Sequence, residues 1–456
     1  MDVSMETDLG ARRRWVAILA LSCGNCVIAV DTSMINVALP TIAQDFHVPL
    51  SAAAMVVSTY QLILLMTVLP LAALAEKYGL RRSYLTGLTV FACAGVGSAL
   101  APNLPVLIVM RALQAIGGAA IISVSPGLIR HTYPADRLGS GLGLNSLIVS
   151  GAAMLAPAFG GAVLAFAAWR WIFVVVLPLA LIAVALGRAL PRTERHSDPY
   201  DFRAAAMSAA TFLLVIGGVQ FAIHGGGRLL CGAGVLAGVV LGVIFMRREK
   251  RSVRPVLPID MLGTRVIALS VLGGFCVHAG SQSIMLVLPF QLEHNYGYTP
   301  VEVGSLLVAW TLAMALTVFV SGRLSNKGPD GLLGVIGMAA CFTGLVGLAF
   351  LPAKPDFADF IWRLALCGAG IGMFLIPNHR LIIGSAPANR MAAAGALVAT
   401  SRMCGQTLGA TLTSLLLAMG AGLGPTPALT AAGLMAVALS CNLVRLRTSL
   451  PLANAR

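Results

Sequence analysis

The chain contains fourteen apolar runs, and each is about as long as a helix that crosses a membrane. An α-helix rises about 1.5 Å per residue, so about 20 apolar residues cross a hydrocarbon core of about 30 Å. Charged residues make up only 11% of this chain, against about a quarter of a soluble domain. The sequence therefore predicts an all-α integral membrane protein. The expected spans are 15–38, 52–75, 83–101, 104–127, 139–166, 170–187, 204–223, 229–246, 266–290, 303–321, 331–351, 360–378, 394–419 and 425–444.

The lysines and arginines alternate between the two sides of these spans. One side carries 25 of the 31 basic residues, the other carries four, and Arg111 and Arg402 fall inside spans. Cytoplasmic loops retain Lys and Arg, so we expect both termini in the cytoplasm and the chain in the plasma membrane, the inner membrane of a bacterium. The net charge of +14 then follows from topology. It indicates the lipid bilayer as partner and argues against a nucleic-acid partner.

The sequence offers little for cofactor, metal or enzyme chemistry. All nine cysteines fall within expected spans, and the Cys23–Cys26 pair lacks a βαβ context, so apolar packing is the better interpretation. The loops contain no phosphate-binding lysine motif, HExxH motif or Ser/His/Asp arrangement. We therefore expect no cofactor, no metal and no enzymatic activity. We also expect a monomer that acts within the membrane.

Two similar turns indicate an internal repeat. Residues 72–82 read AALAEKYGLRR, residues 322–331 read GRLSNKGPDG, and the turns are eight spans apart. Two parallel six-span halves with a two-span insert produce this offset, so we predict two six-helix bundles plus two inserted central helices. The predicted division is a cytoplasmic tail at 1–14, the first bundle at 15–187, a linker at 188–203, the inserted helices at 204–246, a linker at 247–265, the second bundle at 266–444 and a cytoplasmic tail at 445–456.

Asp31 is the only acidic residue deep inside an expected span. A charge in the bilayer interior is costly, so it is normally compensated or functional. Counted along their helices, Asp31 and Arg111 both lie about 10 Å from the outer ends of their spans. An ion pair between them would make Asp31 sensitive to protonation. Three roles remain open for Asp31: a proton carrier, an attractor for a cationic substrate, or a structural partner of Arg111.

Other polar side chains within the spans are candidates for a substrate cavity, with hydrogen bonding between helices as the alternative role of each. Asn36 points about 140° away from Asp31 on a helix, so these two side chains cannot line the same strip. His278 is a candidate for a second titrating group, or else a buried neutral histidine. The cavity candidates are Asn36, Tyr60, Gln61, Gln114, Asn145, Gln282, Trp310, Arg402 and Gln406.

Five motifs follow one another along the first half of the chain: VDTSMINVALP (30–40), AALAEKYGLRR (72–82), RALQAIGGAA (111–120), SGAAMLAPAFGGAVL (150–164) and WRWIF (169–173). In this order they resemble the major facilitator superfamily, and more closely its fourteen-span drug:proton antiporter branch. The resemblance covers the whole chain. Two departures from the family pattern are Ala156, where a glycine is usual before Pro157, and Asn326, which stands at the acidic position of the second turn.

The resemblance implies a proton-coupled multidrug efflux transporter that exports amphipathic small molecules, cationic ones included, by alternating access. Asp31 and Arg111 are the candidates for proton coupling. A dedicated exporter of one metabolite or siderophore, and a receptor or scaffold that moves nothing, remain alternatives. In this family the turn is thought to latch the two halves, and the fifth span to kink and pack closely. The residues of these conformational motifs are Glu76, Lys77, Gly79, Arg81, Arg82, Gly151, Pro157, Gly160 and Gly161.

Overall fold

The chain is helical throughout the part that the structure describes, with no strand among those residues. The structure is a computed structural model of all 456 residues. It describes residues 11–133, 138–191, 202–223, 227–249, 259–324, 330–352, 355–386 and 391–453.

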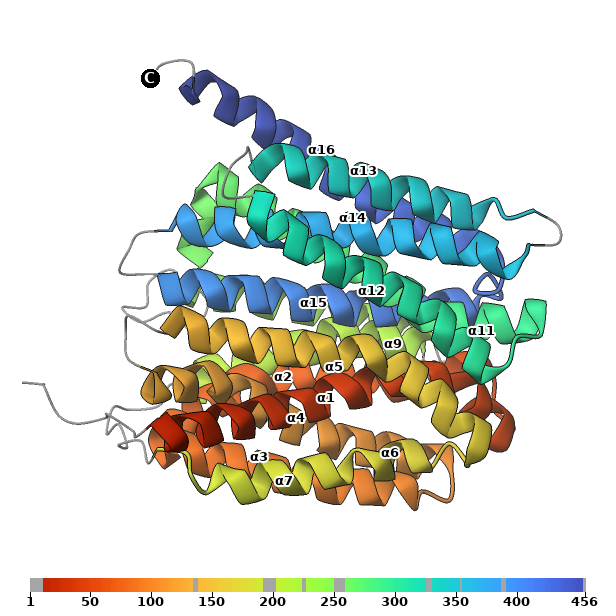
Figure 1. Cartoon of the computed structure of the whole chain (residues 1–456), viewed down its shortest axis with the longest axis horizontal. Helices are drawn as coiled ribbons and strands as arrows, with labels where there is room; N and C mark the ends of the chain where they lie inside the picture. Colours follow the sequence, from red (N-terminus) through yellow and green to blue (C-terminus); the bar gives the residue numbers. More distant parts are fainter. Residues whose placement is uncertain are drawn as a thin grey trace, which may run out of the picture.

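Seven helices form the N-terminal half, which occupies the lower part of Figure 1. The predicted span 170–187 is divided into α6 and α7 at Val176. Pro178, near the start of α7, has no backbone N–H to continue the hydrogen bonding of α6, which explains the break. The helices of this half are α1 (Ala11–Asp45), α2 (Leu50–Tyr78), α3 (Leu80–Ala99), α4 (Leu104–Thr132), α5 (Leu138–Phe166), α6 (Trp171–Val175) and α7 (Leu177–Gly187).

The inserted segment contacts both halves of the molecule. Helix α8 packs against α2, whereas α9 packs against α15 of the C-terminal half. Gln220 Nε2 on α9 donates a hydrogen bond of 3.3 Å to Thr411 Oγ1 on α15. The elements of the insert are α8 (Phe202–Phe212), the π-helix η2 (Leu213–Gly217), α9 (Gly218–Ile223) and α10 (Arg228–Glu249).

The C-terminal half repeats the packing pattern of the N-terminal half. Helix α4 packs on α2 and α3, and α14 packs in the same way on α12 and α13. Helix α1 packs on α5 and α7, and α11 packs on α15 and α16. The predicted fold class, with two related bundles and an insert, is thereby confirmed. The elements of this half are η3 (Ile259–Gly263), α11 (Arg265–Tyr296), α12 (Pro300–Leu324), α13 (Asp330–Ala349), α14 (Phe357–Gly384), α15 (Met391–Ala418) and α16 (Thr426–Ala453).

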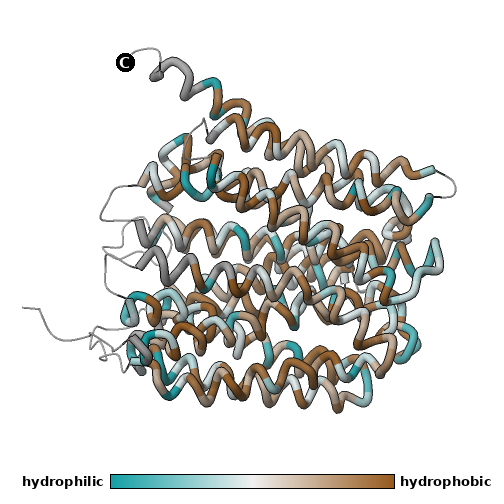
Figure 2. Tube along the Cα trace, in the orientation of Figure 1, coloured by the Kyte–Doolittle hydropathy of each residue, from teal (hydrophilic) through white to brown (hydrophobic). Residues whose placement is uncertain are grey.

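Each predicted span coincides with a helix or with consecutive helical pieces. Within the described residues, ten helices are long and apolar enough to cross a membrane, and Gly151–Phe166 and Trp171–Gly187 are shorter apolar helices. The number of crossings therefore stays a prediction. Large apolar side chains such as Phe166 (93% exposed) and Leu229 (92% exposed) lie on the outside of the molecule, as expected for a surface in contact with lipid. Figure 2 shows that hydrophobic residues predominate along the helices.

The last helix runs beyond residue 444, where the last predicted span ends. Helix α16 continues to Ala453, and Arg445 is buried rather than solvated. Its Nη1 donates to Ser270 Oγ at 2.7 Å and to Asn378 Oδ1 at 3.1 Å, and its Nη2 donates to Asn442. A positive charge beside an apolar run indicated a helix end, but neighbouring polar side chains satisfy this guanidinium inside the bundle.

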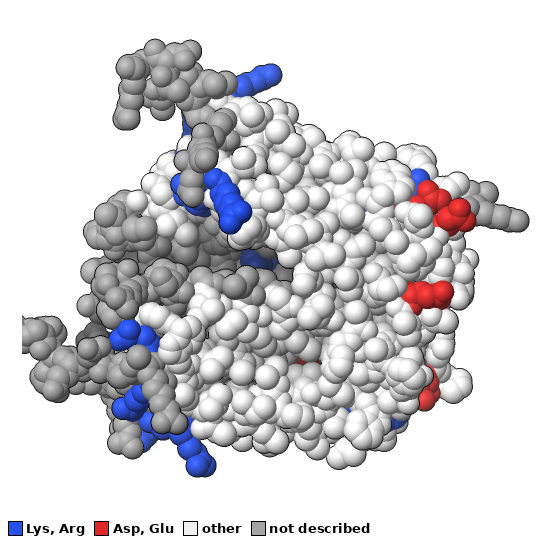
Figure 3. All heavy atoms as spheres, viewed as in Figure 1, with Lys and Arg blue, Asp and Glu red and all other residues white. Residues whose placement is uncertain are grey.

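The two ends of the molecule, where the helices begin and end, differ in charge. Figure 3 shows arginines and lysines gathered at the end where α1 begins, and acidic side chains at the opposite end. We call them the basic end and the acidic end. Arg13, Arg82 and Arg323 lie at the basic end, whereas Asp45, Glu302 and Asp359 lie at the acidic end.

The two halves are in tight contact toward the acidic end. Helix α12 runs obliquely and meets α5 there (Figure 1). A Cβ atom on Gly161 would lie 2.5 Å from Pro300 O, and one on Gly304 would lie 2.6 Å from Pro157 O. Toward the basic end the surface between the halves is hollowed (Figure 3). Among the described residues, the contact between α5 and α12 therefore closes the space between the halves at the acidic end.

Candidate functional site

Asp31 and Arg111 form a buried ion pair in the N-terminal half. Asp31 lies in the middle of α1 and is 1% exposed, and Arg111 on α4 is 0% exposed. Arg111 Nη1 donates to Asp31 Oδ2 at 2.6 Å. Gln114, one turn along α4, completes a triangle: it donates to Asp31 Oδ1 at 3.0 Å and accepts from Arg111 Nη1 at 2.8 Å. Both carboxylate oxygens of Asp31 are thus engaged.

Aromatic rings surround the guanidinium of Arg111. Its Cζ atom lies 4.3 Å from the centroid of the Tyr60 ring and 5.7 Å from that of Phe173. A cation over an aromatic face is attracted by the ring quadrupole, most strongly where water is excluded. Arg111 Nε and Nη2 have no hydrogen-bond partner among the described residues, so Asp31, Gln114 and the rings provide the stabilisation. The pair depends on the negative charge of Asp31, because removing one partner of a buried pair leaves an uncompensated charge.

A second polar cluster joins α1, α4 and α5 closer to the basic end. Asn145 Oδ1 accepts hydrogen bonds from Ser22 Oγ at 3.2 Å and from Asn25 Nδ2 at 3.3 Å. Ser125 Oγ donates to Asn25 Oδ1 at 3.2 Å. Asn145 is one of the cavity residues predicted from the sequence, whereas Asn25 and Ser125 are not. Short polar residues in apolar spans are the signal that marks such hydrogen-bonded helix contacts.

The other predicted cavity residues are dispersed. Tyr60 packs with Met403 of α15, and the backbone oxygen of Gln61 accepts from Thr407 Oγ1 at 3.4 Å, so this part of α2 lies between the halves. Trp310 lies in the hydrophobic core of the C-terminal half, which argues against its lining a cavity. Three further candidates are Asn36 and Gln282, both buried, and Gln406, which is half-buried on α15.

The motif on α5 lies at the contact between the halves. A Cβ atom on Gly160 would lie 3.3 Å from Met34 Cα on α1, and Gly161 faces Pro300 on α12. Thr311 Oγ1 on α12 donates to Met154 O at 3.1 Å. Gly151 differs from the expectation of close packing, because no described heavy atom lies within 4 Å of its Cβ position. Small residues permit close approach of backbones only where another helix is present.

The turn between α2 and α3 depends on Gly79. Its φ of 101° lies in the region that favours glycine, and it ends α2 and precedes α3. Lys77 and Arg82 are exposed and Arg81 is half-buried. The side chain of Glu76, and residues 325–329 of the second turn, lie outside the described residues. The latch role of these side chains therefore stays a prediction.

Cysteine and metal chemistry find no site in the described part of the chain. All nine cysteines are free, and no group of three His, Cys, Asp or Glu residues there is arranged to hold a metal ion. Cys23 and Cys26 lie on α1. These side chains serve as small apolar packing groups.

The paired bundles, the polar interior and the apolar exterior together define a membrane transporter of the secondary type rather than an enzyme. The profile of the Major Facilitator Superfamily matches residues 21–410 and 270–454, and the chain belongs to this family. The branch within the family stays a prediction.

Individual proteins are similar over most of the chain. Uncharacterized transporter YebQ of Escherichia coli (strain K12) is 37% identical over 432 residues, which cover 94% of each chain. The tetracenomycin C resistance and export protein of Streptomyces glaucescens is 29% identical over 420 residues, covering 90% of this chain and 77% of that protein. A POT family transporter crystallised with 5-aminolevulinic acid has the same fold, with a TM-score of 0.73 at 17% identity and 96% coverage of both chains.

Proposed function

We propose that this transporter exports amphipathic small molecules of several kinds in exchange for protons. The observation that carries the proposal is the triangle of Asp31, Arg111 and Gln114. Asp31 is the one acidic side chain among the described residues that lies at the middle of a long apolar helix, and its charge is matched by a single arginine. Because both Asp31 oxygens are engaged, the geometry favours proton exchange over attraction of a cationic cargo.

Protonation of Asp31 would remove the charge that Arg111 requires, and the local packing would then rearrange. A series of contacts leads from Asp31 to the place where α5 meets α12 at the acidic end. Met34 lies one turn after Asp31 on α1 and packs against Gly160 of α5, and the adjacent Gly161 contacts Pro300 of α12. Proton binding at Asp31 would therefore bias the contact between α5 and α12 at the acidic end. This is the coupling that an antiporter requires, because each ligand must favour a different global state.

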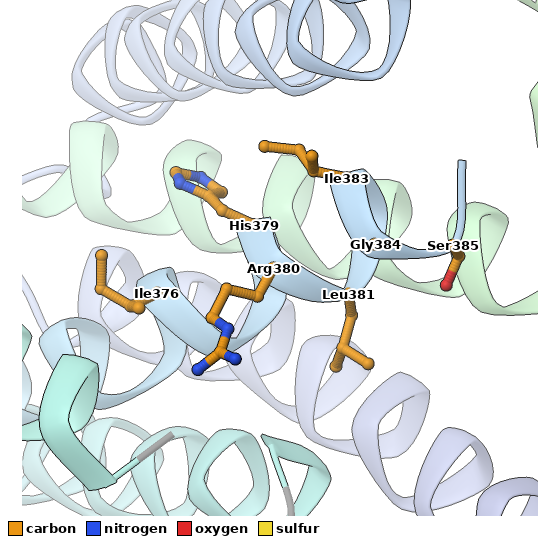
Figure 4. Close-up of a pocket in the computed structure, with 7 residues that line it drawn as sticks. All are labelled: Ile376, His379, Arg380, Leu381, Ile383, Gly384 and Ser385. Carbon is orange, nitrogen blue, oxygen red and sulfur yellow. The ribbon is translucent and has the colours of Figure 1, made fainter. Parts of the chain in front are cut away.

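The direction of transport and the class of cargo are inferred from two kinds of support. One relative in the family is named for resistance and export. A cavity of about 570 Å³ opens along α14, and its lining combines aliphatic side chains with polar and charged ones, which suits amphipathic compounds. The residues that line it are Ile376, His379, Arg380, Leu381, Ile383, Gly384 and Ser385 (Figure 4).

The test uses purified protein in liposomes. Addition of a lipophilic dye to the detergent-solubilised protein is expected to release protons, and a pH gradient across the liposome is expected to drive dye movement against its own gradient. Protein-free liposomes are the control. Dye movement at the same rate with and without the pH gradient would contradict proton coupling. Sensitivity of a host with and without the gene to a panel of toxic compounds would identify cargo.

The orientation in the membrane is part of the proposal, with the division into two bundles, an insert and cytoplasmic tails given above. We expect a reporter placed after Arg195 or Arg251 to be cytoplasmic, and one placed at Gly225 or Asn295 to be external. The reason is the excess of basic residues on one side, 25 against four. Reporter activity in intact cells measures this directly. An external reporter at Arg251 would contradict the arrangement with fourteen spans.

A further inference from the structure

Three basic residues lie on helices that pack against one another in the C-terminal half. They are Arg402 on α15, His278 on α11 and His379 on α14. Gly274 of α11 lies where these helices come together, because a Cβ atom there would lie 3.3 Å from Asn378 Nδ2 and 3.7 Å from Ser401 Oγ, the residues next to His379 and Arg402. His379 was assigned from sequence to a loop, because the predicted span ended at residue 378. Helix α14 instead continues to Gly384, so His379 lies on a helix that packs against α11 and α15.

Close packing of the three helices holds this basic cluster in place. A Cβ atom on Gly405, one turn after Arg402, would lie 3.0 Å from His278 Cβ. Ser401 Oγ donates to Val271 O at 2.9 Å and joins α15 to α11. Asn378 Nδ2 donates to Ser270 O at 3.0 Å and joins α14 to α11. The residues next to Arg402 and His379 are therefore hydrogen-bonded to the helix that carries His278.

Arg402 has neither a carboxylate partner, as Arg111 has, nor the neutral hydrogen-bond partners that satisfy Arg445, among the described residues. Within the described residues, Arg111, Arg170 and Arg363 each contact an aspartate, but no aspartate or glutamate of that part of the chain lies within 4.0 Å of the Arg402 guanidinium. Arg402, His278 and His379 are each half-buried, and His379 is the one of the three that lines the cavity along α14. In Figure 4, His379 lines the 570 Å³ cavity and points away from Arg380.

An arginine without a counter-charge is costly inside an apolar helix bundle, and such residues normally face a cavity or a substrate pathway. The partner that a guanidinium beside two imidazoles suits best is an anion, because all three groups can donate hydrogen bonds and Arg binds carboxylate and phosphate through two donors. Ile376, Leu381 and Ile383 line the same cavity as His379 and give it aliphatic surface. The cluster can therefore bind the charged end of a molecule whose remainder is apolar.

We propose that Arg402, with His278 and His379, binds an anionic group of the transported molecule, so that the cargo includes amphipathic carboxylates, sulfonates or phosphates. This inference rests on the proposed function and narrows its class of cargo. Met403, next to Arg402, packs against Tyr60, and Tyr60 stacks on Arg111. The anion site and the proton site are thus both next to the contact between α2 and α15, where the two halves meet.

The test compares two xanthene dyes of similar size and opposite charge. Fluorescein is anionic and rhodamine 123 is cationic at pH 7.5. Binding to the purified full chain in an uncharged detergent is measured by fluorescence anisotropy, without any proton gradient. We expect Arg402→Gln to weaken fluorescein binding by about 10- to 100-fold, the range that one charged hydrogen bond supports. Rhodamine 123 is expected to bind Arg402→Gln as well as the parent protein or better.

Two matched variants control for charge and for folding. Arg323→Gln removes an exposed arginine that stacks on Phe319 at the basic end, and it is expected to leave fluorescein binding unchanged. Arg402→Lys keeps the charge but loses the paired donors, so its fluorescein affinity is expected to lie between those of the parent and Arg402→Gln. Because Arg402 has no carboxylate partner, its replacement by Gln is expected not to lower the melting temperature. If Arg402 had a purely structural role, Arg402→Gln would lower the melting temperature.

Three outcomes would overturn the proposal. They are equal fluorescein affinity in the parent and Arg402→Gln, no fluorescein binding by the parent, and an equal loss of binding in Arg323→Gln. A lipid phosphate presents the same chemistry as an anionic cargo. If phosphatidylglycerol displaces fluorescein from the parent while fluorescein is not moved across liposomes, the site belongs to lipid and the cargo assignment is wrong. Failure of proton-driven export with intact Arg402-dependent binding would overturn the proposed function alone.

Discussion

Asp31→Asn is expected to abolish export driven by a proton gradient while leaving dye binding in place. Asparagine keeps the shape of the side chain and can still accept a hydrogen bond from Arg111, but it does not titrate. The distances of 2.6 Å to Arg111 and 3.0 Å to Gln114 show that the carboxylate is held by two partners that an amide can satisfy in part. Proton release on addition of dye, measured with the detergent-solubilised protein, is expected to fall to background.

The same substitution leaves the buried Arg111 without a counter-charge, so stability is expected to fall, by about 3–5 kcal/mol at most. The double variant Asp31→Asn with Arg111→Gln removes both charges and is expected to recover most of that loss, because neutral groups replace the pair. It is expected to remain uncoupled. Melting temperature, dye binding and proton release are measured for the parent, the single variant and the double variant.

This series separates the three roles that the sequence leaves open for Asp31. A stable double variant without proton coupling supports a proton carrier. Recovery of both stability and gradient-driven export in the double variant would show a structural pair. A selective loss of rhodamine 123 binding in Asp31→Asn would indicate a cation attractor. Normal gradient-driven export by Asp31→Asn would end the assignment of this residue to proton coupling.

Gly161→Val is expected to prevent closure at the acidic end and to stop export in a protein that remains folded. The added side chain would begin 2.5 Å from Pro300 O and 3.2 Å from Val301 Cα, both of which belong to the opposite half. Overpacking of this kind costs about 1–3 kcal/mol. The halves can avoid the cost by separating, so we expect the closed population to fall by about 5- to 150-fold relative to the parent.

The measurement is the distance between spin labels at Phe166 and Val301, two exposed positions at the acidic ends of α5 and α12. The labels replace these residues in a variant without the nine native cysteines. Gly151→Val is the matched control on the same helix, because no described heavy atom lies within 4 Å of its Cβ position. Equal distance distributions for Gly161→Val and Gly151→Val would contradict the prediction that the halves close at the contact of Gly161 with Pro300.

Hydropathy and charge were sufficient to predict the helices and the class of all-α membrane proteins. Transfer of an apolar residue into lipid is a property of that residue and its near neighbours, so runs of about 20 such residues are visible without tertiary information. The repeated turns at 72–82 and 322–331 then indicated two halves and an insert. Helical rise placed Asp31 and Arg111 at one depth, because distance along a helix axis depends only on sequence separation.

The direction in which a side chain points around its helix, and the side chains that it contacts, depended on the tertiary structure. Depth alone left unknown that Gln114 joins the ion pair, that Tyr60 and Phe173 flank Arg111, and that Arg402 has no acidic partner among the described residues.

The sequence by itself determined a membrane-embedded helical transporter with one acid buried in its interior. The tertiary structure decided which helices pack together, and therefore which glycines touch, as Gly161 does and Gly151 does not. It also decided where helices end, which brought His379 and Arg445 out of predicted loops and into polar clusters. The physical reason is that side-chain pairing depends on the rotation of each helix about its axis and on contacts between distant segments, whereas hydropathy registers only the transfer of a local segment into lipid.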